Sequence, residues 1–259
     1  MPAVKRTASR PVPLTFLVLS LSVAQVSSAL PDEAKLDATL AAPAATPVSE
    51  AKQAAAEPKK EAAAQSAQED SKAKLLATFK ADKSITNSLG MVMVWLEKGY
   101  RVSRYEVTQH DFEQIMKTNP SKFKGDSRPV ENVTWEEAAE FCKKLSAKEQ
   151  ADGKLPGTFY YALPTEAQWD DYVDDAALKD AITSALGDRK NTENVGGLGP
   201  NKFGLYDVRG NVWEWCSSPV ARGGSWRTFE DWLAIGFHYA AAPGTRYDDV
   251  GFRCVLMEQ

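Results

Sequence analysis

Regular hydrophobic patterns begin near residue 84 and continue to residue 257. Short apolar or alternating runs over residues 91–96 and 101–107 are typical of strands. From Asn191 onward glycines are dense, and the pattern predicts several short strands held by long structured loops.

Between these two regions the apolar residues recur at helical spacing. Three helices are predicted, and a threonine suited to capping stands at the start of each: Thr108, Thr134 and Thr165. Thr134 with Glu137, and Thr165 with Gln168, have the spacing of a capping box. A fourth helix is predicted over residues 176–186, ended by Gly187. Helices followed by irregular strands predict an α+β domain over residues 84–257.

Residues 1–29 have the layout of a secretory signal peptide. Three basic residues precede an apolar run over residues 12–24, and small residues, Ser27 and Ala29, stand just before Leu30. The run is short for a bilayer span, although an uncleaved anchor is the alternative. We expect cleavage, no membrane span afterwards, and an exported protein in the periplasm or outside the cell.

Residues 30–74 are rich in alanine and contain four prolines, no aromatic residue and no glycine. Such a segment buries too little apolar surface to offset the entropy of the chain. We predict a disordered linker that acts as a spacer, with transient helix at most over residues 51–67. The alternative is that the segment binds the cell wall or a partner.

Composition limits the classes of function. Of the 25 aromatic residues only Phe16 precedes residue 79, so the folded core belongs to the rest of the chain. The formal charge is −4, and no basic region marks a nucleic-acid-binding surface, so that class of partner is excluded. Two histidines leave little room for an imidazole-rich zinc or iron site. Three cysteines are too few for a disulfide scaffold.

An ordered series of motifs extends through the folded segment: Tyr105-Glu106-Val107-Thr108, Pro129 to Trp135, Phe141-Cys142, Ala162 to Trp169, Pro200 to Asp207, Gly210 to Cys216, Arg222 to Trp226, and Gly251 to Cys254. This series resembles the formylglycine-generating enzyme family, also called the sulfatase-modifying factor family. The resemblance covers nearly all of residues 84–257. It implies a compact α+β domain related to the C-type lectin fold and low in regular secondary structure. A fold hosts many functions, so the motifs alone say little about chemistry.

The family's oxidases carry two cysteines that hold copper(I) after the Gly-Gly-Ser-aromatic motif. The resemblance places these positions at Thr228 and Leu233, and no cysteine lies between Cys216 and Cys254. Copper(I) needs soft thiolate ligands, which a hydroxyl and an isobutyl group do not supply. We therefore expect neither copper nor formylglycine-generating activity, and no residue is assigned a catalytic role.

The resemblance also implies a structural disulfide between Cys142 and Cys254. It would close a loop that contributes about 4 kcal/mol in the chain-entropy model. Cys216 is then left over, either as a small buried residue or as a reactive thiol.

A calcium site is the one cofactor that the resemblance implies. Its ligands would be the side chains of Asp207 and Glu214 and the carbonyl oxygens of Gly210 and Val212. Hard oxygen donors of this kind suit calcium. The alternative is that the two carboxylates bind neighbouring backbone N–H groups without a metal.

The leading functional hypothesis is an exported, non-catalytic recognition or scaffold domain with a protein or glycan partner in the cell envelope. Aromatic and arginine side chains, which are enriched at binding hot spots, gather late in the chain. The candidate contact residues are Trp226, Arg227, Trp232, His238, Tyr239, Arg246 and Tyr247. The alternative for each aromatic residue is a place in the core.

Two other classes stay open. One is an oxidoreductase or metal-dependent enzyme of the same fold with changed chemistry, although His110 and His238 alone do not make an iron site. A solvent-open pocket that holds a Glu or His with a perturbed pKa would favour it. The other is a hypervariable lectin-type receptor whose C-terminal loops are diversified.

Overall fold

The computed structural model describes residues 57–173 and 176–259, all within one compact unit that spans Lys52–Gln259. The predicted signal peptide and the first part of the predicted linker lie outside the described residues. None of the described helices combines the length and apolar character needed to cross a membrane.

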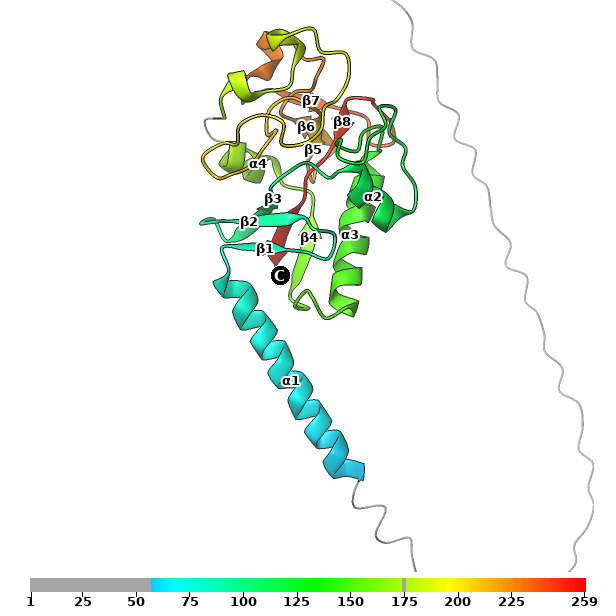
Figure 1. The fold of residues 1–259 in the computed structure, drawn as a ribbon, viewed down its shortest axis with the longest axis vertical. Coiled ribbons are helices and arrows are strands. Elements are labelled where there is room, and N and C mark those ends of the chain that lie inside the picture. Colours follow the sequence, from blue (N-terminus) through cyan, green and yellow to red (C-terminus); the bar gives the residue numbers. More distant parts are fainter. Residues whose placement is uncertain (1–56, 174–175) are drawn as a thin grey trace, which may run out of the picture. The chain divides into compact units, whose positions relative to one another are not determined.

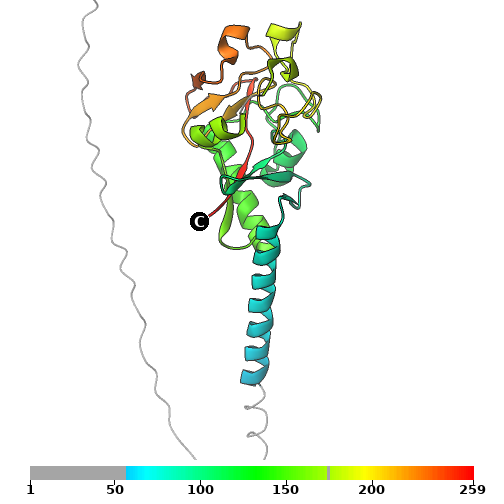
Figure 2. The ribbon, with the colours of Figure 1, turned by 90° about the vertical axis from the view of Figure 1, so that its left-hand side faces the viewer.

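The first described element is helix α1, Glu57–Ala81, which projects from the body of the domain (Figures 1 and 2). The structure therefore differs from the predicted linker over residues 57–74, which belong to this helix. Alanine, glutamate, lysine and glutamine are strong helix formers, and they sustain a helix whose side chains over residues 64–74 are exposed. The C-terminal end of α1 packs on the domain, where the ring of Phe79 meets that of Phe159 at 4.7 Å between centroids.

The larger sheet has five antiparallel strands in the order β1-β2-β3-β9-β4. Their bounds are β1 Ser84–Thr86, β2 Val92–Leu96, β3 Tyr100–Ser103, β4 Phe159–Ala162 and β9 Val255–Glu258. Strand β9 pairs with β3 on one side, where Arg101 faces Leu256, and with β4 on the other, where Ala162 faces Val255. The end of the chain thus lies inside the sheet (Figure 1).

Three further α-helices begin where the sequence predicts them: α2 Gln109–Met116, α3 Trp135–Ala151 and α4 Glu166–Val173. The predicted box at α3 is confirmed, because Thr134 accepts a bond from the Glu137 N–H and the Glu137 carboxylate accepts one from the Thr134 N–H. The same reciprocal bonds join Thr165 and Gln168 at the start of α4.

The predicted fourth helix over residues 176–186 is wrong. Two short 3₁₀ helices, η2 Leu178–Asp180 and η3 Ser184–Leu186, stand there instead. Between them Ile182 forms a parallel bridge with Gly210, and the Asn211 N–H donates to the Ile182 carbonyl at 2.7 Å. A Cβ at Gly210, whose φ is +84°, would lie 2.5 Å from the Ile182 oxygen, so the close approach depends on glycine. This long-range pairing extends the backbone that a helix would have coiled.

The smaller sheet has four strands in the order β7-β6-β5-β8, and β5 and β8 are parallel. The bounds are β5 Trp213–Trp215, β6 Val220–Arg222, β7 His238–Ala240 and β8 Val250–Gly251, with the 3₁₀ helix η4 Glu230–Leu233 between β6 and β7. Two buried apolar clusters form the core, one around α3 and one around α4. The predicted α+β class is confirmed.

Candidate functional site

Thr228 and Leu233, the two positions that the resemblance assigns to the oxidase cysteines, both lie beside Gly224. A Cβ added at Gly224 would lie 2.5 Å from Leu233 Cδ2 and 3.5 Å from Thr228 Cγ2. Both side chains are buried, and the Thr228 hydroxyl accepts a bond from the Ser225 N–H at 2.8 Å. The buried side chains of Leu233 and Thr228 thus fill the space beside Gly224.

An ion pair is fully buried in the domain. The Glu214 carboxylate and the Arg253 guanidinium have no exposed side-chain surface, and Nε lies 2.6 Å from Oε1. The other carboxylate oxygen accepts bonds from Trp169 Nε1 at 3.1 Å and from the Tyr172 hydroxyl at 3.2 Å. Burial raises the pKa of Glu214, and the Arg253 charge opposes that rise.

Three of the predicted calcium ligands, Asp207, Gly210 and Val212, precede β5, and the fourth, Glu214, lies within it. Asp207 Oδ2 accepts a bond from the Gly196 N–H at 2.6 Å, which is the kind of contact that the metal-free alternative predicts. Asp207 Oδ1 is buried and has no hydrogen-bond partner among the described residues. Glu214 Oε1 accepts only the Arg253 bond, so it keeps a lone pair. Asp207 Oδ1 is thus the carboxylate oxygen of this pair that lacks a partner, whereas Glu214 Oε1 already faces the Arg253 guanidinium.

No group of three or more His, Cys, Asp or Glu side chains within the described ranges is arranged to hold a metal ion. Calcium would therefore depend on the carbonyl oxygens of Gly210 and Val212 as much as on side chains. Calcium at this turn stays a prediction.

A third buried carboxylate, Glu106, was not singled out from the sequence. Its oxygens accept bonds from Asn211 Nδ2 at 2.6 Å and from the Val212 N–H at 3.1 Å. Burial raises the pKa of Glu106 well above its ordinary value, and the nearby Asp207 adds to the rise. The sequence indicates its role only through its position between Tyr105 and Val107. An acidic residue inside an apolar, strand-like run is usually buried and accepts hydrogen bonds from buried donors.

The structure brings Cys142 and Cys254 together. Their sulfur atoms lie 3.6 Å apart, and both thiols are buried. The bond between them stays a prediction. Cys216 is buried against β5, and burial raises the pKa of its thiol, which favours the interpretation as a small buried residue.

The predicted contact residues do not form one surface of equal exposure. Four of them are exposed, and three are half-buried: Trp226, Tyr239 and Tyr247. The Arg227 guanidinium lies 4.5 Å from the centre of the Trp226 ring. Tyr239 and Tyr247 meet edge to face at 5.7 Å. Each aromatic residue of this half-buried group therefore has a partner within the protein.

Exposed His238 and Arg246 lie on different parts of the fold. His238 begins β7, whereas Arg246 pairs with Glu137 of α3 at 2.5 Å and donates to the Asn132 carbonyl at 2.7 Å. Arg246 therefore fastens its loop to α3 as well as facing solvent.

The sequence analysis missed most of the exposed large apolar side chains around η3 and η4, which we together call the η3–η4 surface. It consists of the large hydrophobic side chains that are most exposed in the described residues: Leu186 at 49%, Phe229 at 69%, Trp232 at 56% and Ile235 at 38%. Only Trp232 was predicted. Adjacent Leu233 is 2% exposed, so local sequence does not tell which of two neighbouring apolar residues faces solvent.

Buried contacts hold the η3–η4 surface in place. The Ser184 hydroxyl of η3 donates to the Thr228 carbonyl at 3.0 Å, which ties η3 to the segment before η4. Arg222 donates to the Ile235 carbonyl at 2.8 Å, and Arg209 donates to that of Leu233. The η4 segment lies at the end of the domain away from α1 in both views (Figures 1 and 2).

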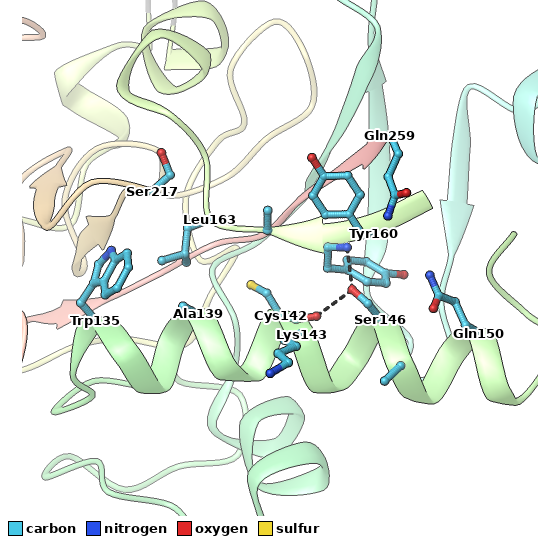
Figure 3. A pocket seen from close by; sticks show the side chains of 13 residues that line it. Trp135, Ala139, Cys142, Lys143, Ser146, Gln150, Tyr160, Leu163, Ser217 and Gln259 are labelled. Carbon is cyan, nitrogen blue, oxygen red and sulfur yellow. Dashed lines mark hydrogen bonds between the residues drawn. The ribbon is translucent and has the colours of Figure 1, made fainter. Parts of the chain in front are cut away.

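A groove of about 550 Å³ runs between α3 and β4 (Figure 3). Trp135 and Tyr160 contribute aromatic rings to it, and Cys142 lies on its floor. The edge of β4 is already covered, because the Tyr161 N–H donates to the Ser146 hydroxyl at 2.8 Å and Gln150 Nε2 donates to the Phe159 carbonyl at 2.8 Å. This groove therefore offers apolar surface but no free strand edge.

A second pocket, about 410 Å³, lies beside the start of α2, and we call it the α2 pocket. Its walls are the turn before β2, residues 103–106, the first turn of α2, residues 126–127 and Val195. It contains Glu106 and Asp111, and burial raises the pKa of both. Each carboxylate accepts internal hydrogen bonds, so neither is a free catalytic base in this arrangement.

Comparisons with known proteins agree with this geometry. The profile of the family described as "Sulfatase-modifying factor enzyme 1-like domain" matches residues 55–257. Chaperone protein LppX of Paenibacillus barcinonensis is 28% identical over 208 residues, covering 58% of this chain and 72% of the relative. Inactive C-alpha-formylglycine-generating enzyme 2 of Mus musculus is 27% identical over 164 residues, covering 49% of this chain and 48% of the relative.

Among solved structures, Treponema denticola variable protein 1 is 26% identical with a TM-score of 0.53, covering 67% of this chain and 93% of that one. PvdO from Pseudomonas aeruginosa is 23% identical with a TM-score of 0.51, covering 62% and 80%. These likenesses confirm the predicted fold, a domain of the formylglycine-generating type related to the C-type lectin fold.

Proposed function

This chain belongs to the sulfatase-modifying factor enzyme 1-like domain family, and from that premise we propose that it is an exported, non-catalytic binding module. Its partner is a polypeptide or glycan of the cell envelope. The module acts by presenting a fixed surface rather than by transforming a substrate.

One observation carries the non-catalytic part of the proposal. The resemblance assigns the oxidase cysteine positions to Thr228 and Leu233, and both side chains are buried beside Gly224. The thiols of the chain are buried, so none is available as an exposed copper ligand. Relatives named as inactive formylglycine-generating enzymes support this part.

The η3–η4 surface supports the binding part. Large apolar side chains that stay exposed on a well-anchored segment are typical of interaction sites, because a soluble domain otherwise buries them. Phe229 and Trp232 are the aromatic anchors of the kind that dominate interface energetics. The relative named chaperone protein LppX supports a polypeptide as the partner.

Capture from the organism's own envelope fraction tests the binding part. We expect the immobilised full chain to retain one or a few proteins or glycans, and the double variant Phe229→Ala/Trp232→Ala to lose them. The matched control is Lys98→Ala/Lys144→Ala, which removes two exposed side chains from elsewhere on the domain. Equal capture by all three proteins would contradict the role of this surface.

The non-catalytic part has its own test. The purified full chain, loaded with copper(I) and incubated with a cysteine-containing sulfatase peptide under oxygen, should form no aldehyde. Mass spectrometry of the peptide measures the product, and formylglycine in it would overturn the proposal. Export is tested separately by N-terminal sequencing of the mature protein, which we expect to begin at Leu30.

The two remaining classes stay open as alternatives. Acids with raised pKa in the α2 pocket are the observation that favours an enzyme with changed chemistry. The likeness to a Treponema denticola protein named "variable protein 1" bears on the receptor class, and comparison of this sequence between isolates would test it.

A further inference from the structure

The α2 pocket holds a cation without a protein partner. Arg104 lines the pocket, its side chain is only partly exposed, and its Nε atom is buried without a hydrogen-bond partner in the described part of the chain. The ion pairs among the described residues do not include its guanidinium, whereas Arg222, Arg227 and Arg253 each have a carboxylate. A partly buried guanidinium is costly unless an anion pairs with it.

The walls of this pocket are fixed before any ligand arrives. The His110 N–H donates to the Asp126 carbonyl at 3.2 Å, and the Val195 N–H donates to the Ser127 carbonyl at 2.9 Å. The Tyr105 ring packs against Tyr206 with centroids 5.1 Å apart. A volume of about 410 Å³ lies within the range of small-molecule sites.

Charge in the pocket rules against a simple anion as the ligand. Besides Arg104 and His110, the lining includes three carboxylates: Asp111, Asp126 and the buried Glu106. Asp126 is exposed, lines the pocket and takes part in none of the ion pairs of the described residues, so it can accept a cation. A ligand with both an anionic and a cationic group satisfies Arg104 and Asp126 together, whereas a polyanion meets repulsion from the acids.

The remaining lining adds a preference for size and polarity. Leu89, Met91, Val92 and Val195 supply apolar surface beside the charged groups. We propose that the α2 pocket binds a small zwitterion with an apolar body, such as an α-amino acid. Its carboxylate pairs with Arg104 and its ammonium group with Asp126. This site is separate from the η3–η4 surface and does not depend on the proposed function.

Calorimetric titration of the purified full chain tests this site with four probes. L-Leucine carries both charges, 4-methylpentanoate lacks the ammonium group, 3-methylbutylamine lacks the carboxylate, and inorganic phosphate is a polyanion. We expect L-leucine to bind and the three other probes to bind at least about tenfold more weakly, because each loses a charge-assisted contact.

Two variants identify the contacts. Arg104→Gln and Asp126→Asn should each weaken L-leucine binding by about tenfold or more. Lys98→Gln is the control, since Lys98 is an exposed partner of Asp171 and does not line the pocket. Arg104 donates no side-chain hydrogen bond among the described residues, so its replacement should leave the melting temperature of the ligand-free protein nearly unchanged.

Three results would overturn the proposal. The first is the absence of binding for every probe. The second is 4-methylpentanoate or phosphate binding as tightly as L-leucine, which would assign the pocket to anions alone. The third is an Arg104→Gln protein that binds L-leucine as the unaltered chain does.

Discussion

Replacement of Arg253 should destabilise the domain more than replacement of any exposed charged residue. The guanidinium lies 2.6 Å from Glu214 and has no exposed side-chain surface. It also donates to the Ser103 carbonyl at 3.1 Å and to the Tyr206 carbonyl at 2.7 Å, so it joins β3, β5 and a loop. Arg253→Ala therefore leaves the buried Glu214 carboxylate without its counter-charge and removes a donor from two carbonyls.

The magnitude follows from these contacts. Removal of one partner of a buried ion pair costs about 3–5 kcal/mol. Each backbone carbonyl left without a donor adds about 1 kcal/mol. A loss of about 5 kcal/mol is a large part of the stability of a typical domain. It corresponds to a fall in melting temperature of about 10 °C or more for a domain of this size.

Arg246→Ala is the matched control. Arg246 also pairs with a glutamate, but its side chain is 41% exposed and that of Glu137 is 32% exposed. An exposed pair contributes about 0–1 kcal/mol, so the melting temperature should fall by no more than about 4 °C. Urea denaturation and thermal melts followed by tryptophan fluorescence measure both variants under the same conditions.

Arg253→Lys keeps the measurement possible if Arg253→Ala does not fold. It retains the charge but loses the planar fork, so we expect an intermediate loss of stability. Equal losses for Arg253→Ala and Arg246→Ala would refute the reasoning, because the burial of the pair would then have no energetic effect.

Three further predictions follow from other groups. Burial raises the pKa of Glu131 to about 7, above its value in the unfolded chain. The folded protein therefore binds the Glu131 proton more tightly than the unfolded chain does, which stabilises the fold at low pH. This stabilisation is lost as the pH rises toward 7. Urea denaturation between pH 5 and 8 should show a steeper loss of stability in the unaltered chain than in Glu131→Gln, which keeps the other buried carboxyls, and equal slopes for the two proteins would contradict the prediction. With Cys142 and Cys254 sulfurs 3.6 Å apart, thiol labelling of the denatured, non-reduced protein should modify Cys216 alone, and labelling of all three would exclude the disulfide. Because Asp207 keeps a free buried oxygen, calcium should raise the melting temperature of the chelator-treated protein but not that of Asp207→Ala. An unchanged melting temperature of the unaltered chain on addition of chelator would exclude a stabilising calcium ion.

The parts of the fold that depend on local chemistry were predictable. Thr134 and Glu137 cap α3 through bonds that span three residues, so the sequence alone contains both partners. By contrast, Ile182 is drawn into an extended bridge by Gly210, which lies in another part of the chain. The helical spacing of apolar residues around Ile182 does not indicate that pairing, so the helix predicted over residues 176–186 was wrong.

The candidate site divides in the same way. The contact between Cys142 and Cys254 was expected only through a family resemblance, since nothing near either residue indicates the other. Leu233 is buried because it packs against Gly224, whereas neighbouring Trp232 is exposed, and hydrophobicity does not encode that difference. The unpaired state of Arg104 is also a tertiary property, because an arginine in a strand-like run usually finds a carboxylate.

The position of β9 has a consequence for how the protein reaches its folded state. Residues 255–258 are inserted between β3 and β4, so the five-stranded sheet cannot close before β9 has been synthesised. Nucleation must bring distant segments together, which slows folding relative to a chain of mostly neighbouring contacts. A nascent polypeptide with this topology cannot pair β3 and β4 through the sheet until β9 has left the ribosome. Deletion of β9 would separate β4 from the other strands rather than merely shorten the sheet.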